Sequence, residues 1–113
     1  MMIVKDTVTI NELKQTAARM FGDMVKAVVD VDRERLAVDA ELHADLEALL
    51  LQDGSEQKSL WGINLYPELP ADQFIEFDSL INLRPSQGNR SRGVEQQDIR
   101  ERVIAVVGKR ISR

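Results

Sequence analysis

One stretch of the chain decides its fold: Met24-Val-Lys-Ala-Val-Val-Asp-Val31, then Asp32-Arg-Glu34, then Arg35-Leu-Ala-Val-Asp-Ala-Glu-Leu42. The first part is rich in valine, which favours a β-strand, and the middle part is a polar turn. The last part alternates between apolar and polar residues, the pattern of a strand with one buried face. Its apolar positions are Leu36, Val38, Ala40 and Leu42. We therefore predict an antiparallel hairpin over residues 24–42.

Helical patterns surround this hairpin. Thr9-Ile-Asn-Glu12 is a capping box, and it precedes apolar residues at helical spacing that end at Gly22. A second, short helix is predicted over His43–Gln52, with an apolar stripe of leucines. A third helix is predicted over Val94–Ile111.

Two further strands are predicted between the second and third helices. They cover Leu60–Tyr66 and Phe74 to about Arg84, and the loop 67–73 between them is short enough for an antiparallel pair. A short strand is also expected at Ile3-Val4, at the start of the chain. We therefore expect a single α+β domain over residues 1–113: two layers, with a mostly antiparallel four-stranded sheet and helices packed on one face.

Composition narrows the classes of protein. The chain has no cysteine, which excludes disulfides and thiolate chemistry, and it shows neither a signal peptide nor a membrane-spanning run. A cytoplasmic location is the resulting expectation. The net charge of −4 is unevenly distributed, because residues 84–113 hold 8 basic and 3 acidic residues. This basic region indicates either an anionic partner or internal compensation of acidic strands.

Alternation along the strands also predicts a polar face. If all the apolar faces meet the helices, the other face of the sheet collects carboxylates, amides, an arginine and a tyrosine. The predicted set is Asp39, Glu41, Asn64, Tyr66, Glu76, Asp78, Asn82 and Arg84. The same pattern fits a sheet face that is simply exposed to solvent, so both interpretations stay open.

A loop dense in Arg, Ser, Asn and Gly follows the last strand. Arginine side chains and glycine backbone amides are typical of a site for a small anion. The ligand-binding candidates are Asn64, Asn82, Arg84, Gly88, Asn89, Arg90, Ser91, Arg92 and Gly93. The residues after Gly93 are Val94 and Glu95, not the Lys-Ser/Thr of a P-loop. The alternative is that these arginines pair with acids of the sheet.

His43 is the only histidine of the chain. With Asp45, Glu76 or Asp78 it could act as an acid–base pair, and with Glu41 added these carboxylates could hold Mn²⁺, Mg²⁺ or iron. The catalytic candidates are therefore His43, Asp45, Glu76 and Asp78, whereas no residue is assigned as a metal ligand and the cofactor stays unknown. Alternatively, the ring of His43 bonds to backbone at the junction of strand and helix.

Four segments together resemble a known family. They are Val25–Val31, Glu41–Asp45, Leu60–Pro67 and Ile75–Val94, with Trp-Gly-Ile-Asn and Arg-Pro-Ser-Gln-Gly-Asn-Arg-Ser as the most distinctive motifs. The chain is similar to small stand-alone prokaryotic proteins grouped as a domain of unknown function. The resemblance implies a complete single domain of prokaryotic type and carries no activity with it.

Two functions are compatible with these residues. The first is a binding or regulatory module that holds a small anionic ligand, or an acidic partner, at the Arg/Gly/Ser loop. The alternative is a small metal-dependent or acid–base enzyme that uses His43. The pI near 5.0 and the lack of aromatic residues after Phe77 argue against nucleic acid, and no membrane partner is expected. Self-association as a homodimer is expected for a small sheet with open edges.

Overall fold

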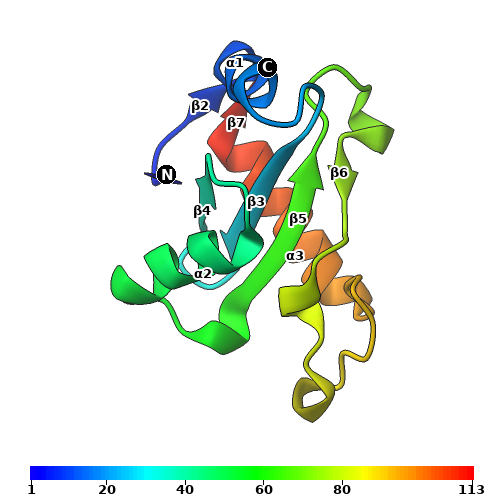
Figure 1. Cartoon of the computed structure of the whole chain (residues 1–113). Coiled ribbons are helices and arrows are strands. Elements are labelled where there is room, and N and C mark those ends of the chain that lie inside the picture. Colours follow the sequence, from blue (N-terminus) through cyan, green and yellow to red (C-terminus); the bar gives the residue numbers. More distant parts are fainter.

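The computed structural model describes all 113 residues, and its centre is a five-stranded antiparallel sheet in the order β1-β4-β3-β5-β6 (Figure 1). The predicted hairpin forms its middle, as β3 and β4, and β5 lies on the other side of β3. The strands are β1 (Met2–Val4), β3 (Val25–Asp30), β4 (Arg35–Val38), β5 (Leu60–Leu65) and β6 (Ile75–Glu76). The hairpin sequence therefore does set the core of the sheet.

Three helices pack against this sheet, namely α1 (Ile10–Arg19), α2 (His43–Gln52) and α3 (Gln97–Arg110). The predicted cap of α1 is present, because the Thr9 hydroxyl accepts the backbone N–H of Glu12 at 3.1 Å. A small parallel pair, β2 (Val8–Thr9) with β7 (Ile111–Ser112), joins the start of α1 to the end of α3. No helix has the length and apolar character needed to cross a membrane.

The two faces of the sheet are covered differently (Figure 1, α2 in front and α3 behind). Residues 27, 29, 36, 61 and 63 face α1 and α3 and belong to the larger of two apolar clusters. Their neighbours along the strands, Val28, Ala37 and Leu60, face α2 instead and pack on Leu46 and Leu50. Because successive side chains of a strand point to opposite faces, the strands contribute apolar residues to two cores, one on each side of the sheet.

These observations confirm the α+β class and the antiparallel sheet. The sheet has five strands because Met2–Val4 pairs with β4. α2 lies on the face opposite α1 and α3, where a polar face was expected. The physical reason is that Val28, Ala37 and Leu60 form an apolar patch on this second face, and the leucines of α2 cover it.

Two predicted strands are shorter than expected. β4 ends at Val38, and Asp39 adopts a positive φ of 74° that turns the chain toward α2, so Asp39 and Glu41 do not extend the strand. The strand expected from Phe74 to Arg84 is regular only over Ile75–Glu76. The rest contains a 3-10 helix, η3 (Leu80–Asn82), and a second one, η4 (Pro85–Gln87), follows directly after Arg84. The third helix starts at Gln97, three residues later than predicted.

Candidate functional site

The candidate site lies on the face of the sheet that carries α2, which we call the α2 face. It lies next to that helix, where α2 leaves part of the sheet uncovered. η3 passes over β5 there because Gly62 has no side chain. A Cβ built on Gly62 would lie 2.5 Å from the Cβ of Ser79 and 3.1 Å from Cγ1 of Ile81. Glycine is therefore required for this close approach.

Asn82 fastens η3 to the sheet. Its side chain is fully buried, and its Oδ1 accepts the N–H of Gly62 at 2.8 Å while its Nδ2 donates to the Gly62 carbonyl at 2.9 Å. The amide thus replaces the backbone of a neighbouring strand. The same Nδ2 donates to the carbonyl of Arg92 at 2.9 Å, which places Arg92 next to η3.

The Arg/Gly/Ser loop is organised by a second buried asparagine. Asn89 donates to the carbonyls of Asn82 (2.7 Å) and Gly93 (2.8 Å), and its Oδ1 accepts the N–H of Glu95 at 2.9 Å. The Glu95 carboxylate in turn accepts the N–H of Arg90. Side chains of the loop therefore already occupy backbone amides that were expected to bind an external anion.

The three arginines of the predicted anion site do not come together. Arg84 lies over the ring of Trp61, with 4.0 Å between its Cζ and the ring centroid, and it donates to the carbonyls of Gln57 and Leu60. Burial lowers the pKa of Arg84. Arg90 is exposed, and its side chain makes no hydrogen bond or ion pair. Only Arg92 reaches the uncovered part of the α2 face. Gly88 serves a tight turn, with φ of 82°, and Ser91 accepts the N–H of Gly93.

Arg92 is oriented by Asp78. Its Nε donates to Oδ1 of Asp78 at 2.6 Å, whereas its two Nη groups have no partner in the chain. An arginine that is held through Nε keeps its outer pair of N–H donors for a ligand. The outer Nη groups of Arg92 are thus oriented by Asp78 and available as hydrogen-bond donors.

His43 is the first residue of α2, and its ring reaches the sheet. Nε2 lies 2.8 Å from the carbonyl oxygen of Ile63. Since a carbonyl can only accept, Nε2 carries the proton of the neutral ring and Nδ1 keeps its lone pair, with no partner in the chain. Burial, together with the positive charges of Lys26 and Arg92, lowers the pKa of His43 below its ordinary value of 6.5. The ring is therefore neutral at pH 7.

These groups line a hollow of about 180 Å³, which we call the α2 hollow. It lies between β3, the first turn of α2 and η3, with Arg92 on one side. Its lining residues are Lys26, Leu42, His43, Ala44, Ser79, Leu80, Ile81 and Arg92. Two cations, one neutral imidazole and an apolar wall thus meet in one place. The start of α2 adds to the positive potential because no side chain caps its N–H groups.

Three predicted polar residues lie on or next to the neighbouring strands β5 and β6: Asn64 in β5, Tyr66 just after it, and Glu76 in β6. Oε1 of Glu76 accepts from Nδ2 of Asn64 at 2.8 Å and from the hydroxyl of Tyr66 at 3.0 Å. Partial burial and the Glu76 carboxylate raise the pKa of Tyr66. Oδ1 of Asn64 is buried without a partner, and Asn64 sits directly opposite Lys26 in the register of β3 and β5. Glu76 is thus already engaged, whereas Asn64 keeps a free acceptor.

The metal-binding interpretation finds no cluster to support it. Asp45 is exposed on the outer side of the first turn of α2, and Asp78 is paired with Arg92. Nowhere in the chain do three or more His, Asp or Glu side chains converge as metal ligands would.

Sequence reasoning missed the two most informative lining residues, Lys26 and Ser79. Lys26 is the single charged residue between the valines and alanine that begin β3, and this break in an apolar strand is a detectable signal. Ser79 gives a weaker signal, because its Oγ caps η3 by accepting the N–H of Ile81, a role that many serines fill.

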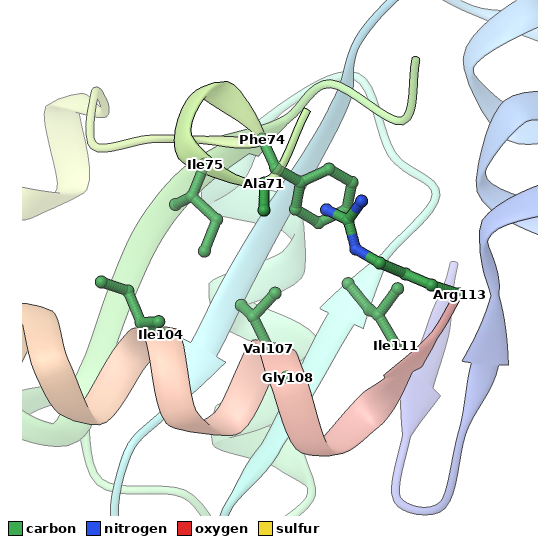
Figure 2. Close-up of a pocket in the computed structure, with 8 residues that line it drawn as sticks. All are labelled: Ala71, Phe74, Ile75, Ile104, Val107, Gly108, Ile111 and Arg113. Carbon is green, nitrogen blue, oxygen red and sulfur yellow. The ribbon is translucent and has the colours of Figure 1, made fainter. Parts of the chain in front are cut away.

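A second hollow, of about 170 Å³, lies on the opposite side of the sheet (Figure 2). We call it the α3 hollow. The last turns of α3 form one wall, and the segment around η2 (Ala71–Gln73) and β6 forms the other. Six of its eight lining residues are apolar. Its one charged group, the Arg113 guanidinium, lies over the ring of Phe74 with 4.5 Å between Cζ and the ring centroid.

Fold and site together define an α+β domain whose antiparallel sheet carries helices on both faces and an amphipathic hollow beside α2. Over residues 2–110 the chain matches the model of a family described as a protein of unknown function (DUF5674), and it belongs to that family. Comparisons with curated proteins and with solved structures gave no match.

Proposed function

We propose that the protein is a binding or regulatory module that holds a small anionic ligand in the α2 hollow. The observation that carries this proposal is the geometry of Arg92. Asp78 fixes its guanidinium through Nε, and both Nη groups remain without a partner at the edge of the hollow. Preorganised donors lower the entropic cost of binding a ligand.

Lys26 and the start of α2 support the same conclusion. Lys26 makes no ion pair, and its Nζ lies 5.1 Å from the ring centroid of Phe21. The charged groups that act on His43 are Lys26, Arg92 and Asp78, which carry a net single positive charge. The hollow therefore favours a ligand with one negative charge.

Thermal unfolding at constant ionic strength tests this proposal. Sulfate, phosphate and acetate are compared, because a ligand that binds only the folded state adds about 2.7 kcal/mol of stability at a hundredfold excess over its Kd. We expect at least one anion to raise Tm and Arg92→Gln to abolish the rise. Arg90→Gln is the matched control from the same loop. An effect that depends equally on both arginines, or no effect of any anion, would contradict the proposal.

An acid–base enzyme is the second candidate, and one observation favours it. His43 is held as the neutral Nε2–H tautomer, so its Nδ1 is free to take a proton from a bound molecule. One variant distinguishes a protein that only binds from an enzyme. His43→Gln should retain anion-induced stabilisation if the protein only binds, and it should abolish turnover of any substrate if the protein is an enzyme.

We also propose that the protein works in the cytoplasm of a prokaryote as a homodimer. A chain without cysteine needs no oxidising compartment to fold. The strands at the two edges of the sheet, β1 and β6, have unpaired outer edges that a second copy could cover. Sedimentation equilibrium should give twice the mass of the chain, 12.8 kDa, and a monomer at all concentrations would contradict the dimer.

A further inference from the structure

We infer that the ligand of the α2 hollow is a small monocarboxylate with an aliphatic body. This inference rests on the proposed anion-binding function and adds the chemical class of the ligand. It follows from three features of the hollow: a planar pair of donors, a single net positive charge and an apolar wall.

The donor pair fits a carboxylate. The two free Nη groups of Arg92 lie in one plane and can bind both oxygens of a carboxylate in parallel. Asp78 already neutralises one of the two cations, so Lys26 supplies the one charge that remains uncompensated. A dianion would leave one negative charge without a partner beside Asp78.

The apolar wall of the α2 hollow favours a ligand that has an apolar part as well as a charge. Leu80 and Leu42 are 65% and 56% exposed, and apart from Met1 they are the most exposed large apolar side chains of the chain. Both line the same hollow, together with Ala44 and Ile81. Placing the two most exposed leucines on one small cavity leaves apolar surface in water unless a ligand covers it.

The volume of the α2 hollow limits the size of the aliphatic part of the ligand. A cavity of about 150 Å³ holds a molecule the size of benzene. The α2 hollow, with about 180 Å³, therefore takes an aliphatic acid of about six carbons. Longer chains would extend past Leu80 into solvent and gain no further contact.

A chain-length series of linear carboxylates tests the inference on the whole protein. Kd is measured by NMR titration for acetate, propionate, butyrate, pentanoate, hexanoate and octanoate, with sulfate as an inorganic anion. We expect Kd to fall by roughly two- to fourfold for each methylene that becomes buried, and to level off beyond about six carbons. A flat series would overturn the inference.

Exposed leucines provide matched variants that leave the core intact. Leu80→Ser should flatten the series. Leu83→Ser, a leucine 43% exposed but outside the hollow, should leave the series unchanged. If hexanoate binds to Leu80→Ser and to Arg92→Gln as tightly as to the natural chain, the aliphatic acid occupies another place and the inference is wrong.

The experiment separates the inference from the proposal beneath it. If acetate and sulfate bind through Arg92 but added methylenes bring no gain, the anion site stands and the aliphatic class is wrong. A weak single-site complex has a Kd of about 1 mM. If neither a carboxylate nor sulfate binds at concentrations up to about 100-fold above that Kd, both the inference and the proposed function are wrong.

Discussion

The α2 hollow and the α3 hollow are almost equal in volume, about 180 and 170 Å³, but lie on opposite faces of one sheet. The α3 hollow continues the larger core to the surface, and its walls are mainly aliphatic (Figure 2). The α2 hollow combines leucines with Lys26, His43 and an oriented Arg92. The two hollows thus have nearly equal volumes but differ in the groups that converge on them. Orientation and charge complementarity depend on those groups and not on volume.

The strongest test of this comparison removes the Asn82 side chain, which holds η3 in place as one wall of the α2 hollow. Asn82→Ala leaves the N–H and carbonyl of Gly62 and the carbonyl of Arg92 without their partner in a buried place. We expect the free energy of unfolding to fall by about 3 kcal/mol. Chemical denaturation measures the loss, and Asn11→Ala, an exposed amide on α1, should change it by less than about 0.5 kcal/mol.

A second test prevents the close contact between η3 and the sheet. In Gly62→Ala the new methyl group would lie 2.5 Å from Cβ of Ser79, so η3 must move outward. We expect a loss of about 1–3 kcal/mol of stability, together with loss of anion binding. Denaturant unfolding and anion titration check both effects. A variant as stable as the natural chain would show that η3 is not packed as described.

Gly108 offers the corresponding change in the α3 hollow, with the opposite sign. A Cβ on Gly108 meets nothing within 4 Å, and the residue lies inside α3. Gly108→Ala should therefore raise the free energy of unfolding by about 0.5–1 kcal/mol, because alanine favours the helix. Anion binding should not change. If Gly108→Ala weakened anion binding while stabilising the fold, the α3 hollow would be the site.

The smallest expected effect is the pH dependence contributed by His43. Its pKa in the folded protein is lowered by burial, so the unfolded chain binds the proton more tightly. This contribution to stability is complete above pH 6.5 and is lost as the pH falls below that value. Asp32, Glu34 and Asp53, whose pKa values are also lowered, titrate in a more acidic range.

Unfolding curves between pH 7.5 and 5.5 measure this contribution. His43→Gln should show a shallower fall of Tm over this range than the natural chain. The charged groups that act on His43 are Lys26, Asp78 and Arg92, and all three are present in both proteins, so the comparison isolates His43. Equal slopes in the two proteins would mean that His43 is not buried against β5.

The sequence predicted those elements whose signal is local. The hairpin of β3 and β4, the Thr9 cap and both ends of α2 follow from alternation, turn residues and helical spacing. The face that α2 covers could not be predicted, because its leucine stripe fits an apolar patch on either side of the sheet. Likewise, the pattern from Phe74 to Arg84 alternates as a strand does, but Asn82 pairs with Gly62 through its side chain and ends the strand early.

The candidate site was predicted only in part. His43, Asp78 and Arg92 do converge at one edge of the α2 hollow, as expected for polar residues on one face. Arg84 satisfies carbonyls of its own chain instead, and a sequence does not reveal which arginine bonds internally. Lys26, Ser79 and Leu80 were missed because Lys26 belongs to another element than the other two, and only the packing of η3 against β5 brings them together.

A crystal structure of the protein grown with hexanoate tests the central claim most directly. We predict that the carboxylate lies on the Nη groups of Arg92 and the aliphatic chain between Leu42 and Leu80. Hexanoate in the α3 hollow, with its carboxylate on Arg113, would contradict it.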